Sequence, residues 1–312
     1  MKIKCILCES SNVIATRKVD VEQLKVVYSI ANIDISPDVK GLTEIVLFNC
    51  SDCQCGFFSP TNHGTQEFYE QLQGMPWYYP EDKSEFELAS KYIKNNDSVL
   101  EIGCGAGNFA RYVNQEKYVG LEYTSMAVKL ARSKGLNVLS ESIEIFSEKN
   151  KNIFDIVCFY QVLEHVAKPG EFLRCAIKCL KPGGLMIVSV PSEDSFLALS
   201  VNNILNMPPH HITRWNDQAL LNLTNLLDME LVRIQHEILS DLHLQGYLQA
   251  IVLRLLSSKY RVETPLLDLS FSYKLRVKMG QILIKLFLPV FQSKFLRPYG
   301  HSVTAIYRIR KH

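Results

Sequence analysis

The sequence has no long hydrophobic run and little net charge. Its 34 Lys and Arg residues nearly balance its 32 Asp and Glu residues, so no basic stripe indicates nucleic-acid binding. The most apolar stretch, 282–291, is too short to span a bilayer and is interrupted by Lys285 and Pro289. With no apolar leader, internal repeat or low-complexity tract, and with 47% hydrophobic residues, the chain is expected to be a folded cytoplasmic protein.

Glycine is also scarce, yet three of the 15 glycines fall at alternate positions after a predicted buried strand. The segment Val99–Phe109 reads as an apolar strand, then Gly103, Gly105 and Gly107, then a helical pattern. Such a loop lets the backbone approach a nucleotide at the carboxyl end of a strand. A dinucleotide fingerprint would have Gly or Ala at its sixth position, where this chain has Asn108. The spacing favours S-adenosylmethionine (SAM), and a tight turn without a ligand is the alternative.

A carboxylate follows the next predicted strand. Glu122 ends the run Tyr118–Glu122, where it can accept hydrogen bonds from both ribose hydroxyls of SAM or NAD; an exposed surface Glu is the alternative. After the third predicted strand, Glu141 and Ser142 are candidates to contact adenine. The other residues predicted to bind the cofactor are Glu101, Cys104, Asn108, Phe109, Tyr123, Tyr160 and Gln161.

Strands and helices alternate through the centre of the chain, which predicts an α/β fold. Over residues 75–240 the chain resembles the class I SAM-dependent methyltransferases, and this resemblance implies a Rossmann-like, seven-stranded sheet with SAM over its carboxyl ends. The chain departs from that family at Ser140–Glu141, where relatives often have Gly-Asp. The alternating segment 300–309 predicts a last, antiparallel strand at the edge of the sheet. The motifs that carry the resemblance are Leu100–Gly107, Phe154–Val157, Leu163–His165 and Leu180–Gly184.

Two Cys-x-x-Cys pairs near the N-terminus predict a zinc site. Cys5, Cys8, Cys50 and Cys53 would supply four thiolates to one tetrahedral ion, which would fold a lobe too small for a large core of its own. Cys55 is an alternative fourth ligand. Disulfides or unrelated free thiols are the other readings, and a reducing cytosol argues against disulfides.

A zinc lobe joined to a methyltransferase core resembles the sugar and surface-glycan-precursor methyltransferases, especially in the segment Asn206–Trp215. The resemblance places the acceptor there and makes His210 and His211 the leading candidates for general base. Imidazole titrates near neutral pH, and Pro208 and Pro209 restrict the loop. The alternative for at least one of the two is that it caps or packs the following helix. His165 is a third candidate base, with packing beneath the ligand as its alternative.

An aromatic stretch upstream of the first strand offers Tyr78 and Tyr79, which are predicted to line the SAM pocket through cation–π attraction. Ordinary packing between the lobe and the core is the competing interpretation.

We therefore predict a zinc lobe at 1–65 and a methyltransferase domain at 66–312 with a helical insertion at 241–298. The expected reaction is methylation, at oxygen or carbon, of a nucleotide-linked sugar or glycan precursor. A quinone or lipid methyltransferase is one alternative, and a non-catalytic protein whose zinc lobe binds a partner is another. Basic residues in 274–298 predict a peripheral contact with the inner face of a membrane, against a lid or dimer helix.

Overall fold

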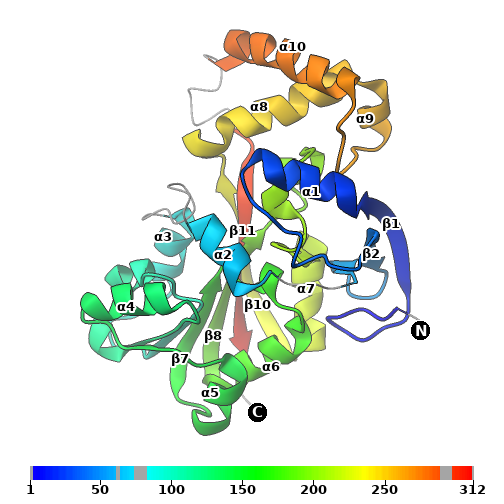
Figure 1. Ribbon diagram of the computed structural model, residues 1–312. Helices are drawn as coiled ribbons and strands as arrows, with labels where there is room; N and C mark the ends of the chain where they lie inside the picture. Colours follow the sequence, from blue (N-terminus) through cyan, green and yellow to red (C-terminus); the bar gives the residue numbers. More distant parts are fainter. Residues whose placement is uncertain (1–2, 61–63, 74–82, 289–296, 311–312) are drawn as a thin grey trace.

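The computed structural model describes residues 3–60, 64–73, 83–288 and 297–310, which form two sheets and a group of C-terminal helices (Figure 1). In chain order the elements are β1 Val13–Asp20, α1 Val21–Ile30, β2 Glu44–Cys50, β3 Gly56–Ser59, α2 Gln66–Gln73, α3 Ser84–Ser90, β4 Val99–Ile102, η1 Asn108–Tyr112, η2 Gln115–Lys117, β5 Tyr118–Leu121, α4 Ser125–Ser133, β6 Val138–Leu139, α5 Ile143–Lys149, β7 Phe154–Tyr160, η3 Leu163–His165, α6 Pro169–Cys179, β8 Leu180–Pro191, η4 Phe196–Leu199, η5 Ile204–Asn206, β9 Thr213–Arg214, α7 Asp217–Leu226, β10 Met229–Ile238, α8 Asp241–Leu256, α9 Ser258–Val262, α10 Phe271–Phe287 and β11 Tyr299–Ile309.

The larger sheet confirms the predicted fold. Its seven strands run in the order β10-β11-β8-β7-β4-β5-β6, with the five strands from β8 to β6 parallel. β11 is antiparallel to both of its neighbours. This is the Rossmann-like arrangement of class I methyltransferases.

The prediction of β11 as the edge strand was wrong. β11 lies between β8 and β10, and β10 forms the edge. Val303, Ala305, Ile306 and Tyr307 are fully buried, because helices cover both faces of the sheet at this position and the strand reads as nearly continuous apolar sequence.

Side chains of the parallel strands alternate between two apolar layers. In β7, Val157 and Phe159 point to the layer shared with α5, α6 and α7, whereas Ile156 and Cys158 point to the layer shared with α3, η1 and α4. Short apolar strands buried on both faces thus form the centre of the sheet. All of their carboxyl ends lie along one edge, which leaves that edge open for a ligand.

The smaller sheet has the order β1-β2-β3-β9 and belongs to the N-terminal lobe. α1 packs on it through Leu24 and Tyr28. The same apolar cluster also includes Phe68 of α2 and Met207 from the loop before β9, so the lobe packs against segments far along the chain. The boundary at residue 65 stays a prediction.

The described residues of the predicted insertion form helices α8, α9 and α10, with α8 and α10 lying along one another (Figure 1). Their apolar cluster includes Leu244, Leu248 and Ile284, and it reaches Phe196 of η4 beside the end of β8. Within the described ranges, no helix is long and apolar enough to cross a membrane.

Candidate active site

The loop after β4 has the backbone geometry that its glycines predicted. Gly103, Gly105 and Gly107 have φ values of 70°, 52° and 73°. The amide of Gly103 donates to the carbonyl of Leu121 at the end of β5, which joins the two strand ends. The helical pattern that follows forms the short 3-10 helix η1, which ends where Val113 returns to an extended backbone.

Replacing Gly103 by Ala is expected to weaken SAM binding at least about tenfold, because the new Cβ would lie 2.5 Å from Cγ2 of Val162 in addition to the strain of a positive φ. Gly135→Ala is the matched control. Its φ is +82°, but a Cβ there meets no atom within 4 Å, so it should lose some stability and keep its SAM affinity. Calorimetric titration of both variants checks this, and equal affinities would contradict the role of the loop.

The side chain of Glu122 is held beside this loop by two hydrogen bonds from backbone amides. Its Oε2 accepts from the amide of Gly105 and its Oε1 from the amide of Thr124, each at 2.8 Å. Each carboxylate oxygen has a second lone pair, so both oxygens can still accept from the two hydroxyls of a ribose. The geometry fits the predicted role of Glu122.

One large cavity of about 1840 Å³ opens over the carboxyl ends of the strands. Most of its wall is apolar, and it reaches from the glycine loop to α8 and the end of β11. The structure places Gly107, Phe109 and Ser142 behind its wall; Phe109 is fully buried, and the hydroxyl of Ser142 caps α5. The predicted cofactor residues that line the cavity are Glu101, Gly103, Cys104, Gly105, Asn108, Glu122, Tyr123, Glu141, Tyr160 and Gln161. Tyr78 and Tyr79 lie outside the described residues.

Glu101 lies near the end of β4, directly before the glycine loop. Its Oε2 accepts from the hydroxyl of Tyr118 at 2.5 Å, and burial raises the pKa of this carboxyl to about 8. Because the carboxyl group of Glu101 is neutral and hydrogen-bonded, its burial costs little free energy. Tyr160 is the last residue of the neighbouring strand β7. Its hydroxyl is buried and has no hydrogen-bond partner among the described residues.

The three predicted histidines meet in the wall of the same cavity. One ring nitrogen from each of His165, His210 and His211 lies within 4.8 Å of the others. Nδ1 of His165 lies 2.6 Å from the carbonyl oxygen of His210. Nδ1 of His210 lies 3.0 Å from the carbonyl oxygen of Leu205. Nδ1 of His211 lies 3.2 Å from Oδ1 of Asn206. An oxygen beside each Nδ1 favours the tautomer that presents an Nε2 lone pair.

Glu164 lies beneath two of these rings. Its Oε1 is 3.8 Å from Nε2 of His165 and 3.9 Å from Nε2 of His211. Neither carboxyl oxygen has a hydrogen-bond partner in the part of the chain that the structure describes. Burial raises the pKa of Glu164 to about 8, lowers that of His165 to about 4, and lowers those of His210 and His211 well below their usual range. The cluster is therefore neutral near pH 7.

The N-terminal lobe holds the histidine loop in place. The amide of Phe58 in β3 donates to the carbonyl of Ile212, and β3 pairs with β9 at Phe57 and Thr213. From the other side, the amide of Ile212 donates to the carbonyl of Glu164. The loop is thus clamped between the lobe and the end of β7.

Sequence reasoning missed the polar groups that orient His211. Asn206 accepts at Oδ1 from His211 and donates from Nδ2 to Glu193, whose other oxygen pairs with Arg214 at 3.0 Å. Arg214 also donates to the carbonyl of Asn206. Asn206 and Arg214 belong to the segment Asn206–Trp215 that predicted the acceptor site. Their contacts with Glu193 join separate parts of the chain, so no local sequence pattern indicates them.

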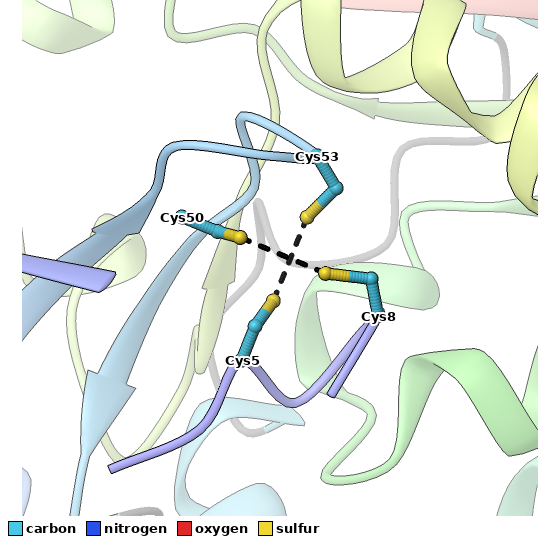
Figure 2. A group of neighbouring side chains, drawn as sticks. All are labelled: Cys5, Cys8, Cys50 and Cys53. Atoms are coloured by element: carbon cyan, nitrogen blue, oxygen red, sulfur yellow. Dashed lines mark hydrogen bonds between the residues drawn. The ribbon is translucent and has the colours of Figure 1, made fainter. Parts of the chain in front are cut away.

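The four predicted zinc ligands come together in the lobe. The sulfurs of Cys5, Cys8, Cys50 and Cys53 lie within 4.8 Å of one another and point to a common centre (Figure 2). The Cys5–Cys53 and Cys8–Cys50 sulfur distances are 3.5 and 3.6 Å. Zinc–sulfur bonds of about 2.3 Å in a tetrahedron would give about 3.8 Å. The donor set therefore fits zinc.

The two Cys-x-x-Cys turns have the same backbone geometry. Glu9 and Gln54, each directly after the second cysteine of its pair, both have φ of 63°, and both donate their amide to the carbonyl of the first cysteine. Cys55 lies outside this arrangement. Its side chain is fully buried, and its sulfur is not part of the four-sulfur group.

The sheet order and the glycine loop have the arrangement of the class I methyltransferase fold. In agreement, residues 81–234 match the family model described as "Methyltransferase domain". An uncharacterised protein of Methanocaldococcus jannaschii is 32% identical over 115 residues, which are 37% of this chain and 54% of that protein. The mitochondrial ubiquinone biosynthesis O-methyltransferase of Dictyostelium discoideum is 29% identical over 142 residues, covering 38% of this chain and 44% of that enzyme.

The chain thus spans about half the length of the curated relatives it matches. Among solved structures, a SAM-dependent methyltransferase from Archaeoglobus fulgidus covers 78% of this chain and 98% of its own, with 17% identity and a TM-score of 0.46.

Proposed function

We propose that this protein transfers a methyl group from SAM to a small acceptor. One observation carries the proposal: the glycine loop, Glu122 and the three-histidine cluster line a single cavity. The match of residues 81–234 to methyltransferase domains supports it. The alternative of a non-catalytic zinc-lobe protein would not require this open cavity.

The residues of the loop fit SAM. The backbone of Gly103 and Gly105 would face its amino-acid end, and Glu122 would accept from its ribose hydroxyls. When bound, SAM supplies a methyl group on a positively charged sulfur, so the protein needs mainly to align an acceptor and remove its proton. The neutral, lone-pair tautomers of His210 and His211 suit that removal, with His165 as a third candidate.

The pH profile should reflect these lowered histidine pKa values. A base acts only when unprotonated, and a base with a pKa below the usual value of about 6.5 stays unprotonated further into acid. We expect kcat/KM to stay level from neutral pH down to about pH 5. Rates measured in overlapping buffers check this, and a fall to half near pH 6.5 would contradict a buried histidine base.

The acceptor enters between the histidines and an apolar wall. The sugar or glycan precursor that the sequence predicted remains our first candidate acceptor. A quinone precursor is the second, favoured by the mostly apolar lining, which includes Phe196, Leu239 and Leu253, and by relatives named for ubiquinone biosynthesis. The test is transfer of labelled methyl from SAM to a panel of sugar nucleotides and prenylated catechols. Transfer to none of them would overturn both acceptor assignments.

We propose that zinc occupies the four-thiolate site and acts structurally. All four positions of a tetrahedral ion are filled by cysteines, which leaves none open for chemistry. The role of this metal would be to fix the turn between β2 and β3 and, through β3 and β9, the histidine loop.

We also propose that the segment 274–298 makes a peripheral contact with a membrane. The alternative is that it forms a lid or a helix of a dimer interface. α10 exposes an apolar row with lysines beside it, which suits an anionic surface. Co-sedimentation with anionic vesicles tests this, and no retention would overturn it. The row is Phe271, Leu275, Met279 and Ile282, and the neighbouring lysines are Lys274 and Lys278.

A further inference from the structure

A second group of ligand-type side chains, distinct from the predicted catalytic histidines, lines the same cavity. Glu237 of β10, His243 of α8 and His301 of β11 each offer an atom within 4.8 Å of the others. All three line the cavity. The carbonyl of His301 accepts from the amide of Ser192, directly after β8, so the group lies at the carboxyl edge of the sheet.

Glu237 and His301 are in direct contact at a distance that also fits two ligands of one metal ion. Oε2 of Glu237 and Nδ1 of His301 are 2.8 Å apart, yet neither atom makes a hydrogen bond within the described ranges. A proton on Nδ1 of His301 would make this contact an ion pair, and a metal ion bound to both atoms is the other way to hold them this close. Adjacent ligands of one metal ion, each about 2.1 Å from it and roughly at a right angle, are about 3.0 Å apart.

Hydroxyl groups orient both rings from outside. Nε2 of His301 lies 3.1 Å from Oγ of Ser302, and Nδ1 of His243 lies 2.9 Å from Oγ of Ser240. Ser240 occupies the N-cap of α8, yet its side chain makes no capping hydrogen bond. A serine that faces a histidine instead of capping its helix matches the outer hydrogen bonds of metal-binding imidazoles.

The backbone also makes room for the carboxylate. The register between β10 and β11 shifts between His236 and Ile238, that is, at Glu237. Such bulges re-aim side chains near functional sites. Across the shift lies Gly300, where a Cβ would come within 2.7 Å of Oε2 of Glu237. The carboxylate therefore occupies space that only glycine leaves.

We propose that Glu237, His243 and His301 bind a divalent first-row transition-metal ion whose open positions face the cavity. Two imidazoles and one carboxylate suit such an ion and leave positions for further oxygen ligands. Resting on the proposed function, the ion would hold an oxygen of the acceptor, such as a hydroxyl or a phosphate.

Cobalt titration of the zinc-loaded protein tests the site. We expect the wild type to bind one Co²⁺ per chain with visible d–d bands and without the thiolate-to-cobalt charge transfer that the cysteine site would give. Outer hydrogen bonds alone change metal affinity about 10- to 100-fold, so Glu237→Gln and His243→Gln should weaken Co²⁺ binding at least about 100-fold, and Ser240→Ala about tenfold.

His236→Gln is the matched control, since His236 is the neighbour of Glu237 but bonds to Asp217 outside the group. It should bind Co²⁺ as the wild type does. No cobalt outside the thiolate site, or binding that Glu237→Gln leaves unchanged, would overturn the metal site. Titration of SAM into the same samples tests the proposed function separately from the metal site. Failure to bind SAM would overturn the proposed function, whereas the evidence from cobalt for the metal site would be unaffected. An acceptor KM unchanged in Glu237→Gln would overturn the link to the acceptor.

Discussion

Replacing His211 by alanine should lower kcat about 10²- to 10⁴-fold, the range for loss of a general base. His211 lines the cavity, its Nδ1 is fixed by Asn206, and Glu164 lies beside its Nε2. The affinity for SAM should stay the same, because His211 makes no contact with the glycine loop, and Glu122 is held by the amides of Gly105 and Thr124. Turnover at saturating SAM, combined with calorimetry, separates the two effects.

His236→Ala provides the control for this experiment, because His236 lies outside the cavity wall and pairs with Asp217. His210→Ala and His165→Ala identify which ring accepts the proton. Unchanged turnover in all three cluster variants, with the fold intact, would remove the cluster from the chemistry.

Replacing Cys50 by serine should release the zinc and unfold the N-terminal lobe. Zinc binding contributes about 10–16 kcal/mol to the folding of small zinc-dependent modules, which is as large as the whole stability of many domains. The turnover should also fall by more than about tenfold, since β3 holds the histidine loop through β9 and each 1.4 kcal/mol of lost alignment is a factor of ten. Metal analysis, thermal unfolding and kcat measure the three effects.

Cys55→Ala is the matched variant, a neighbouring buried cysteine outside the four-sulfur group. It should keep one zinc per chain. Zinc retained in Cys50→Ser, or lost in Cys55→Ala, would contradict the assigned ligands.

The parts of the site that are local in sequence could be predicted from it. Strand β4, its glycines and Glu122 lie in short segments where hydrophobicity and glycine spacing report directly on backbone geometry. The two Cys-x-x-Cys pairs are likewise local, and the loop length of such a pair favoured Cys53 over Cys55 as the fourth ligand.

Relations between distant segments could not be predicted in the same way. The pairing of β3 with β9 joins the lobe to the histidine loop through only two residue pairs, which leave no pattern in the sequence. The position of β11 inside the sheet depends on burial of both its faces. Glu237, His243 and His301 come from three elements and meet because of one register shift, so no spacing rule would have found them.

The most direct test of the account is calorimetric titration of SAM into the zinc-loaded protein, with Glu122→Ala as its partner experiment. We predict one site per chain with a Kd on the order of micromolar. Glu122→Ala should weaken it at least about 30-fold, because hydrogen bonds to a charged group contribute about 1.5–3 kcal/mol each. The exposed Glu116→Ala should bind as the wild type does. A folded wild-type protein that binds no SAM would contradict the account.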